Sequence, residues 1–330
     1  MREIAISVIV ILLTPHDASA YLHFSFSARG QTLSLKWART PVRWFATDRG
    51  APGVSAAAFQ AAIVRAFGTW EAVPTASISF QFAGFSGAEP FEDDDLSVLG
   101  FQNEPEMERV LGATGFVVDT LTGEILESDV FFNSAFLWST SPTGDPARFD
   151  LESVALHEIG HFLGLGHSMI GETEPRPEGG RRVLGTSAVM FPIAFGRGST
   201  QDRVLQPDDI AGVSDLYPAE SFRSRTGVAR GRVVRGGTGI LGAHVVAFNP
   251  KTSELIAGFS VNRDGEFQIA GLTPGPHVMR VEPLDDADVE SFFGRSDPVD
   301  ANFQVTVHDR LFVAPAGGVG ERFVVTVRPK

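Results

Sequence analysis

Three histidines and one glutamate lie close together in the sequence at spacings that suit a metal site. His157 and His161 are four residues apart, and Glu158 follows the first of them. Residues four apart share one face of an α-helix, so these two imidazoles can bind one metal ion. The glycines after His161 can adopt the left-handed backbone that ends a helix and turns the chain back, which would bring His167 to the same ion.

Three neutral imidazoles leave one tetrahedral position on zinc open to water, which is the arrangement of a catalytic zinc. The sequence therefore predicts one catalytic Zn²⁺ bound by His157, His161 and His167. Glu158 would be the general base that activates the zinc-bound water for attack on a peptide carbonyl. It would then pass the proton to the leaving amine, so the predicted reaction is peptide hydrolysis.

These residues need a rigid element and a neighbouring place for a substrate. Asp150 is a suitable N-cap for a helix that carries the histidines. Residues 111–119 and 125–133 are apolar runs joined by a turn, which predicts a β-hairpin. A hairpin strand at a sheet edge has unpaired backbone groups that could pair with an extended polypeptide.

The remaining elements up to residue 218 follow from apolar periodicity and turn signals. We expect an amphipathic helix over residues 54–73 and a short helix over 207–217, with residues 168–186 as a loop between the third histidine and the second helix. Extended segments are expected at residues 33–45, 77–82 and 96–101.

From residue 226 onward, helical periodicity gives way to short β-rich runs separated by turns, and an acidic loop is expected at residues 285–300. The number and spacing of the runs favour a small immunoglobulin-like β-sandwich. The predicted strands cover residues 227–234, 244–248, 255–261, 267–269, 277–281, 303–307 and 322–327.

Composition limits the classes of protein that fit. A chain of 330 residues with 43% hydrophobic residues can form two ordinary cores. The formal net charge of −13 argues against a nucleic-acid surface. The chain contains no cysteine, so disulfides and thiolate metal ligands are excluded.

The first residues have the three parts of a secretory signal peptide: a short charged start, an apolar run over residues 4–13, and the small residues 18–20. We expect cleavage after Ala20 and a secreted protein, either extracellular or periplasmic. A membrane anchor is the alternative, but the apolar run is about half of the roughly 20 residues needed to span a bilayer.

The motif and the residues after it resemble the metzincin peptidases, whose histidine signature is followed by a methionine in a tight turn. Met190, within residues 187–192, matches that methionine, and Ser168 and residues 206–218 resemble the matrixin branch. Pro192 stands where other branches carry a tyrosine, which also favours a matrixin. The resemblance spans residues 33–218.

The resemblance implies several roles. Met190 would support the three imidazoles by packing without binding zinc, residues 111–119 would be the edge strand for substrate, and residues 191–198 would help form a specificity pocket. There is no histidine between His23 and His157, so the second, structural zinc of vertebrate matrix metalloproteinases is expected to be absent. Without cysteine, the cysteine switch of those enzymes is also excluded.

The expected fold class is α+β. A signal peptide at residues 1–20 would precede a matrixin-like zinc peptidase domain at 21–219, with a twisted mixed sheet, an active-site helix and a C-terminal helix. An all-β domain at 220–330 would follow, and it resembles carboxypeptidase regulatory-like modules. The expected partner is a polypeptide substrate, with neither a nucleic acid nor a stable membrane anchor.

Several alternatives remain open at this stage. The acidic residues 92–95 could bind calcium or could form a solvated loop. The sandwich could be a spacer or could bind substrate, a cell-surface partner or a glycan. The whole chain could instead be a secreted binding or adhesion protein whose peptidase-like domain is inactive. His23 is expected in a loose terminus, whereas His244, His277 and His308 lack ligand spacing.

Overall fold

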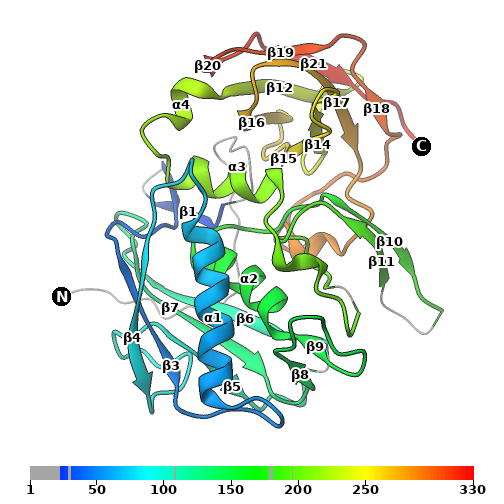
Figure 1. The fold of residues 1–330 in the computed structure, drawn as a ribbon. Helices are drawn as coiled ribbons and strands as arrows, with labels where there is room; N and C mark the ends of the chain where they lie inside the picture. Colours follow the sequence, from blue (N-terminus) through cyan, green and yellow to red (C-terminus); the bar gives the residue numbers. More distant parts are fainter. Residues whose placement is uncertain (1–22, 29–30, 108, 178–180, 195) are drawn as a thin grey trace.

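A computed structural model of the protein describes residues 23–28, 31–107, 109–177, 181–194 and 196–330. The predicted signal peptide lies outside these residues. Figure 1 shows a sheet with two long helices in the first half of the chain, and further strands in the second half that lie against helix α3 (Pro207–Leu216). Within the described ranges, no helix is long and apolar enough to cross a membrane.

The first half is built on a five-stranded sheet in the order β4-β3-β5-β7-β6. The first four are parallel, and β6 runs antiparallel to β7 at the edge of the sheet. The predicted hairpin and its edge strand are therefore confirmed. The strands are β3 (Val42–Thr47), β4 (Phe80–Ser86), β5 (Val98–Gln102), β6 (Gly112–Val118) and β7 (Ile125–Asn133).

Helix α1 (Ala56–Glu71) packs against α2 (Leu151–Phe162), the helix that carries the histidine motif. The predicted apolar stripe of α1 is buried, and its last member, Trp70, donates a hydrogen bond from Nε1 to the Leu156 carbonyl of α2 at 2.9 Å. Fully burying a large apolar side chain contributes roughly 2 kcal/mol. Asp150 caps α2 as predicted, because its side chain accepts a hydrogen bond from the Ser153 amide at 2.9 Å.

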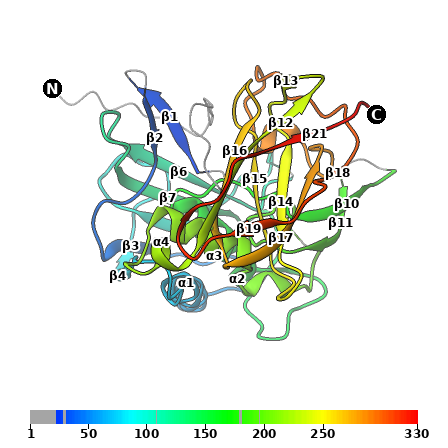
Figure 2. The same cartoon turned by 90° about the horizontal axis from the view of Figure 1, so that it is seen from above.

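The second half contains two five-stranded sheets whose facing side chains share one buried cluster. Every predicted strand overlaps an observed one. Figure 1 shows these strands above α3, and in Figure 2, seen from above, they lie over the helix, which contacts β15 and β16. The first sheet comprises β12 (Gly227–Arg235), β13 (Thr238–Gly239), β16 (Glu266–Leu272), β20 (Gly318–Val319) and β21 (Phe323–Thr326). The second comprises β14 (His244–Phe248), β15 (Leu255–Phe259), β17 (Gly275–Glu282), β18 (Thr306–Val307) and β19 (Phe312–Ala314).

Two expectations about the chain were wrong. Residues 168–186 are not only a loop, because β10 (Gly171–Pro175) and β11 (Arg181–Thr186) pair as an antiparallel hairpin. Their side chains are mostly polar, so backbone pairing forms the hairpin without an apolar period in the sequence. The extended segment 33–45 is also divided, since β2 (Gln31–Ser34) pairs with β1 (Ser25–Ala28) and β3 begins only after Pro41.

The connections contain several short elements. These are β8 (Trp138–Ser139), β9 (Phe149–Asp150), the 3-10 helix η1 (Gln201–Arg203), α4 (Phe222–Arg225) and the 3-10 helix η2 (Val289–Ser291).

Strand β7 carries two buried carboxyl groups, Glu127 and Asp129, each 3% exposed. Asp129 accepts hydrogen bonds from the amides of Val98 at 2.7 Å and Phe91 at 2.6 Å. Burial raises the pKa of Asp129 to about 7. Burial, reinforced by the negative charge of Asp129, also raises the pKa of Glu127 to about 7.

The raised pKa of Glu127 predicts a pH-dependent stability. The folded-state pKa exceeds the unfolded value of about 4.3, so the folded protein holds the proton more tightly and loses stability as pH rises from about 4.5 to 7. A Glu127→Gln variant should lose this part of the slope and be more stable than the unaltered protein at pH 8, by about 1 kcal/mol. Urea unfolding between pH 5 and 8 measures the difference. Glu71→Gln removes a charge at an exposed position as the control, and equal slopes in both variants would contradict the prediction.

Candidate metal centre

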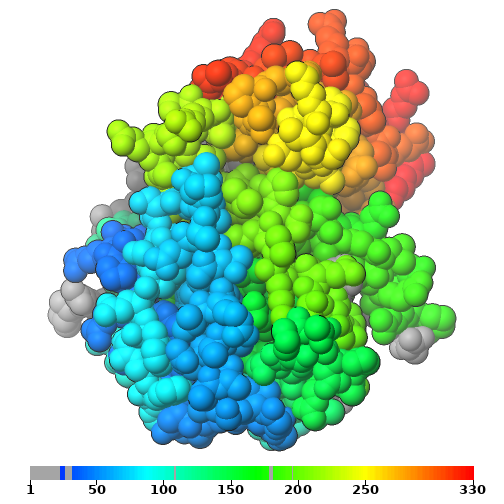
Figure 3. All heavy atoms as spheres, in the orientation of Figure 1, coloured from blue at the N-terminus to red at the C-terminus, as the bar shows by residue number. Residues whose placement is uncertain are grey.

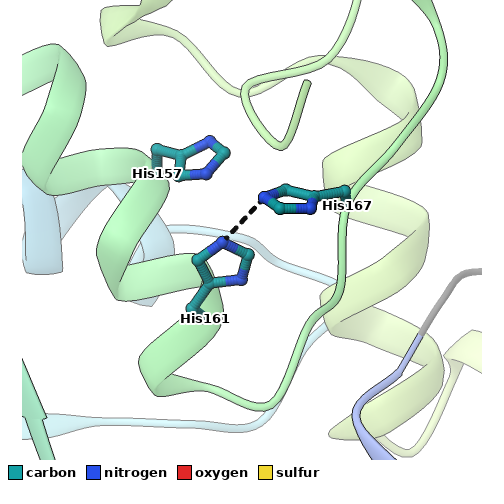
Figure 4. A group of neighbouring side chains, drawn as sticks. All are labelled: His157, His161 and His167. Atoms are coloured by element: carbon teal, nitrogen blue, oxygen red, sulfur yellow. Dashed lines mark hydrogen bonds between the residues drawn. The ribbon is translucent and has the colours of Figure 1, made fainter. Parts of the chain in front are cut away.

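The three histidines of the motif converge on one point, as Figure 4 shows. His157 and His161 project from α2, which ends at Phe162. Gly164 then turns the chain with a φ of +94°, and a Cβ at this position would lie 2.2 Å from the carbonyl oxygen of Leu35. Only glycine fits here. The turn brings His167 back, so that one ligand atom from each ring lies within 4.8 Å of the others.

Each imidazole has its Nδ1 atom beside a backbone carbonyl oxygen. The distances are 2.8 Å from His157 to Val189, 2.8 Å from His161 to Leu165, and 2.7 Å from His167 to Ser291. A carbonyl oxygen can only accept, so each Nδ1 carries the proton. Each Nε2 atom is therefore left with a lone pair, which is the form of imidazole that binds a metal.

The Nε2 atoms of His161 and His167 lie 3.2 Å apart, a contact that Figure 4 draws as a dashed line. With both Nδ1 protons donated to carbonyl oxygens, neither Nε2 has a proton to share with the other. Two lone pairs that face each other at this distance repel one another, and a cation between them would remove the repulsion. The residues present thus fit a zinc ion bound by three neutral imidazoles.

The pKa values of the three histidines are shifted in the direction that favours metal binding. Burial lowers the pKa of His157. Burial, together with the charges of its two neighbours, lowers the pKa of His161 well below its ordinary value. Burial and the charge of His157 lower the pKa of His167 to about 3. The rings are therefore neutral near pH 7, and no proton has to leave before a metal binds.

Glu158 lies between the histidines and the edge strand of the sheet. Its Oε2 atom accepts a hydrogen bond from the hydroxyl of Thr114 on β6 at 2.8 Å. Burial raises the pKa of Glu158 to about 7, although the Thr114 hydroxyl opposes this shift. Thr114 was not identified from the sequence, where it is one polar residue in a run that predicts only a strand.

Met190 lies in a buried turn beneath α2. A Cβ on Gly160 of that helix would lie 2.2 Å from the Met190 sulfur, so the helix and the turn are in close contact. The buried carboxylate of Asp209 in α3 accepts hydrogen bonds from the amides of Val189 at 2.8 Å and Met190 at 3.1 Å. The turn that offers the Val189 carbonyl to His157 is thus fixed to α3.

The histidines and Glu158 line a cleft of about 1520 Å³. One wall is the start of β6 and the residues before it, and the segment around Phe191–Pro192 forms another. Both segments were expected beside the site from the family resemblance. Hairpin β10–β11 also lines the cleft, as do two residues from the second half of the chain, Asp288 and Ser291.

The beginning of the described chain also contacts the site. Phe24 stacks on the His161 ring with a centroid distance of 5.3 Å, and its amide donates to the Gly164 carbonyl at 2.9 Å. His23 is 7% exposed and forms a bridge with Leu165. The expectation that His23 lies in a loose terminus was therefore wrong, because its backbone pairs with the turn after α2.

Within the part of the chain that the structure describes, the three motif histidines are the one group of side chains that could hold a metal ion. Calcium binding by the acidic residues 92–95 gains no support.

Two histidines in the second half of the chain have partners other than a metal. His244 pairs with Glu282 at 2.9 Å, and His277 contacts the Gly275 carbonyl at 3.1 Å.

Comparison with known proteins places the same part of the chain in a family. Residues 36–174 match the Matrixin family model, so the three histidines and Glu158 lie inside the matched stretch and Met190 lies beyond it. Together with the fold and the histidine cluster, this match identifies a matrixin-like metallopeptidase over these residues.

Individual relatives agree with this assignment. Metalloendoproteinase 1 from Glycine max is 31% identical over 174 residues, which are 48% of this chain and 45% of the relative. Metalloendoproteinase 2-MMP from Arabidopsis thaliana is 32% identical over 168 residues, or 47% of this chain and 36% of the relative. Matrilysin from Homo sapiens is 32% identical over 99 residues, 30% of each chain. The chain thus spans less than half of the length of these relatives.

Proposed function

We propose that this protein is a secreted zinc-dependent endopeptidase with one catalytic zinc held by His157, His161 and His167. The observation that carries the proposal is the set of three Nε2 lone pairs that face one another. Each Nδ1 atom donates its proton to a backbone carbonyl oxygen, which leaves the Nε2 lone pairs free. Relatives named metalloendoproteinases support the same reaction class.

Bound zinc would supply Lewis acidity, which makes water more acidic and polarises a carbonyl group. Residues of the protein itself would carry out the other steps. Thr114 holds Oε2 of Glu158, which leaves Oε1 to take a proton at the cleft and return it to the leaving amine. The edge strand β6 would align an extended substrate through its unpaired backbone groups. Met190 would support the site from beneath without binding the metal.

The proposal extends to location and domain organisation. The signal pattern of residues 1–20 supports export and cleavage near Ala20. The two sheets around a shared core support an immunoglobulin-like sandwich at residues 220–330 after a peptidase domain at 21–219. Mass spectrometry of protein recovered from the medium or periplasm should give a chain that begins at Tyr21.

Metal analysis tests the proposed cofactor. We expect the purified mature protein to contain one zinc per chain and to hydrolyse a casein-type substrate. Dialysis against a chelator should remove both zinc and hydrolysis, and added Zn²⁺ should restore both, because the histidines are already neutral near pH 7. Hydrolysis by protein that contains no metal would overturn the proposal.

A further inference from the structure

One segment of the second half of the chain reaches the metal centre. Residues 283–300 are the larger part of the connection from β17 to β18, and they leave the sheet to cross toward α2. The Ser291 carbonyl oxygen, at the end of η2, accepts the hydrogen bond from Nδ1 of His167 at 2.7 Å. Asp288 and Ser291 also line the cleft. The third histidine is therefore oriented by a group that lies 124 residues further along the chain.

Burial of aromatic side chains holds this segment in place. Phe292 is 1% exposed and Phe293 is 3% exposed, and both pack on Phe259 of β15 at centroid distances of 5.3 and 5.7 Å. Phe292 also contacts the His167 ring edge-on at 6.0 Å. Met169 and Phe191, which flank the metal centre in sequence, belong to the same buried cluster.

Polar contacts hold the start of the segment, at Asp285 and Asp286, against hairpin β10–β11. The Thr173 amide donates to the Asp286 carboxylate at 2.9 Å, and its hydroxyl donates to the Asp286 carbonyl at 2.6 Å. Arg181 donates to the Asp285 carbonyl at 2.8 Å. Figure 3 shows the two halves of the chain as one continuous body on the face that it presents. The segment is thus held by apolar contacts with β15 and by polar contacts with hairpin β10–β11.

The three histidines differ in where their acceptors come from. His157 and His161 use the carbonyls of Val189 and Leu165, which belong to the proposed peptidase domain at residues 21–219. His167 uses Ser291, which belongs to the β-sheet half. Groups that accept the second imidazole proton of a metal ligand fix its tautomer and ring direction, and their loss typically lowers metal affinity by about 10- to 100-fold.

We propose that residues 283–300 complete the zinc site, with the Ser291 carbonyl as the positioning group for His167. The C-terminal half of the chain then contributes to the metal centre through this segment and is more than a spacer. This inference rests on the proposed function only in that it takes the three histidines as zinc ligands.

The test makes the Ser291 carbonyl oxygen a weaker hydrogen-bond acceptor in the full-length mature protein. Incorporation of phenyllactic acid in place of Phe292 turns the Ser291 carbonyl into an ester carbonyl, which is a weaker acceptor, and keeps the phenyl ring. It also removes the Phe292 amide that donates to Val289 at 2.9 Å. The matched control places phenyllactic acid at Phe293, whose amide donates to the same Val289 carbonyl at 3.0 Å. Only the first change alters the acceptor of His167.

We expect the ester at Phe292 to weaken zinc binding about tenfold in a chelator competition, relative to the ester at Phe293. The visible absorption of the Co²⁺-substituted protein should also change only for the ester at Phe292, because this absorption reports the ligand geometry. Thermal unfolding of the two zinc-free proteins should agree. Equal zinc affinities and equal cobalt spectra would overturn the inference. Failure of the unaltered protein to bind zinc would instead refute the proposed function.

Discussion

A Glu158→Gln protein is expected to bind zinc as the unaltered protein does and to cleave peptides at least about a hundredfold more slowly, since a positioned general base typically contributes 10²- to 10⁴-fold. Glutamine has nearly the same size, and its amide oxygen can still accept the Thr114 hydrogen bond. It cannot take up a proton near neutral pH. Steady-state cleavage of a quenched peptide and metal analysis of the same sample measure both parts of the prediction.

The control for this variant lies on the same helix. Glu152 is in the first turn of α2 and forms an ion pair with Arg65 at 2.7 Å, away from the histidine cluster. Glu152→Gln should leave cleavage within about twofold, because the Glu152 side chain does not line the cleft and glutamine can still accept the Arg65 hydrogen bond. If Glu158→Gln keeps the cleavage rate of this control, the role given to Glu158 is wrong.

An Asp209→Ala protein is expected to lose about 3 kcal/mol of unfolding free energy. The carboxylate accepts hydrogen bonds from the buried amides of Val189 and Met190, and from the Gln206 amide at 2.9 Å. Removing it leaves three amide groups without this acceptor, each at a cost of about 1–3 kcal/mol if it stays dry. Zinc affinity should fall as well, because the same turn offers the Val189 carbonyl to His157.

Urea unfolding and chelator competition on Asp209→Ala measure these two effects. Asp264→Ala is the matched control, since the Asp264 side chain is 80% exposed and such surface changes usually stay within about 0.5 kcal/mol. A loss of stability without any loss of zinc affinity would contradict the claim that the turn held by Asp209 orients His157 for zinc binding.

The sequence was most informative where one short stretch contains both the chemistry and its local geometry. The spacing of His157 and His161 requires a helix, and Gly164 allows the turn that returns His167. The apolar runs at residues 111–119 and 125–133, joined by a turn, likewise predicted β6 and β7, and β7 is buried along almost its whole length. In both cases the residues that carry the signal are neighbours within one short stretch of the sequence.

The features that were missed depend on backbone groups or on distant contacts. Hairpin β10–β11 is held by main-chain pairing between mostly polar residues, so no apolar period marks it. Ser291 acts through its carbonyl oxygen, which every residue type has, and it meets His167 only because the two halves pack together. The backbone of His23 pairs with Leu165, and this pairing again has no side-chain signal in the sequence.

The most direct test of the account is a cleavage profile of the mature protein on a diverse peptide library, with Glu158→Gln and chelator-treated samples beside it. We predict internal cleavage by the unaltered protein, none in the two controls above background, and recovery when Zn²⁺ is returned to the chelated sample. A protein that binds zinc tightly at His157, His161 and His167 yet cleaves no peptide in the library would contradict the endopeptidase assignment and favour a metal-binding or adhesion protein.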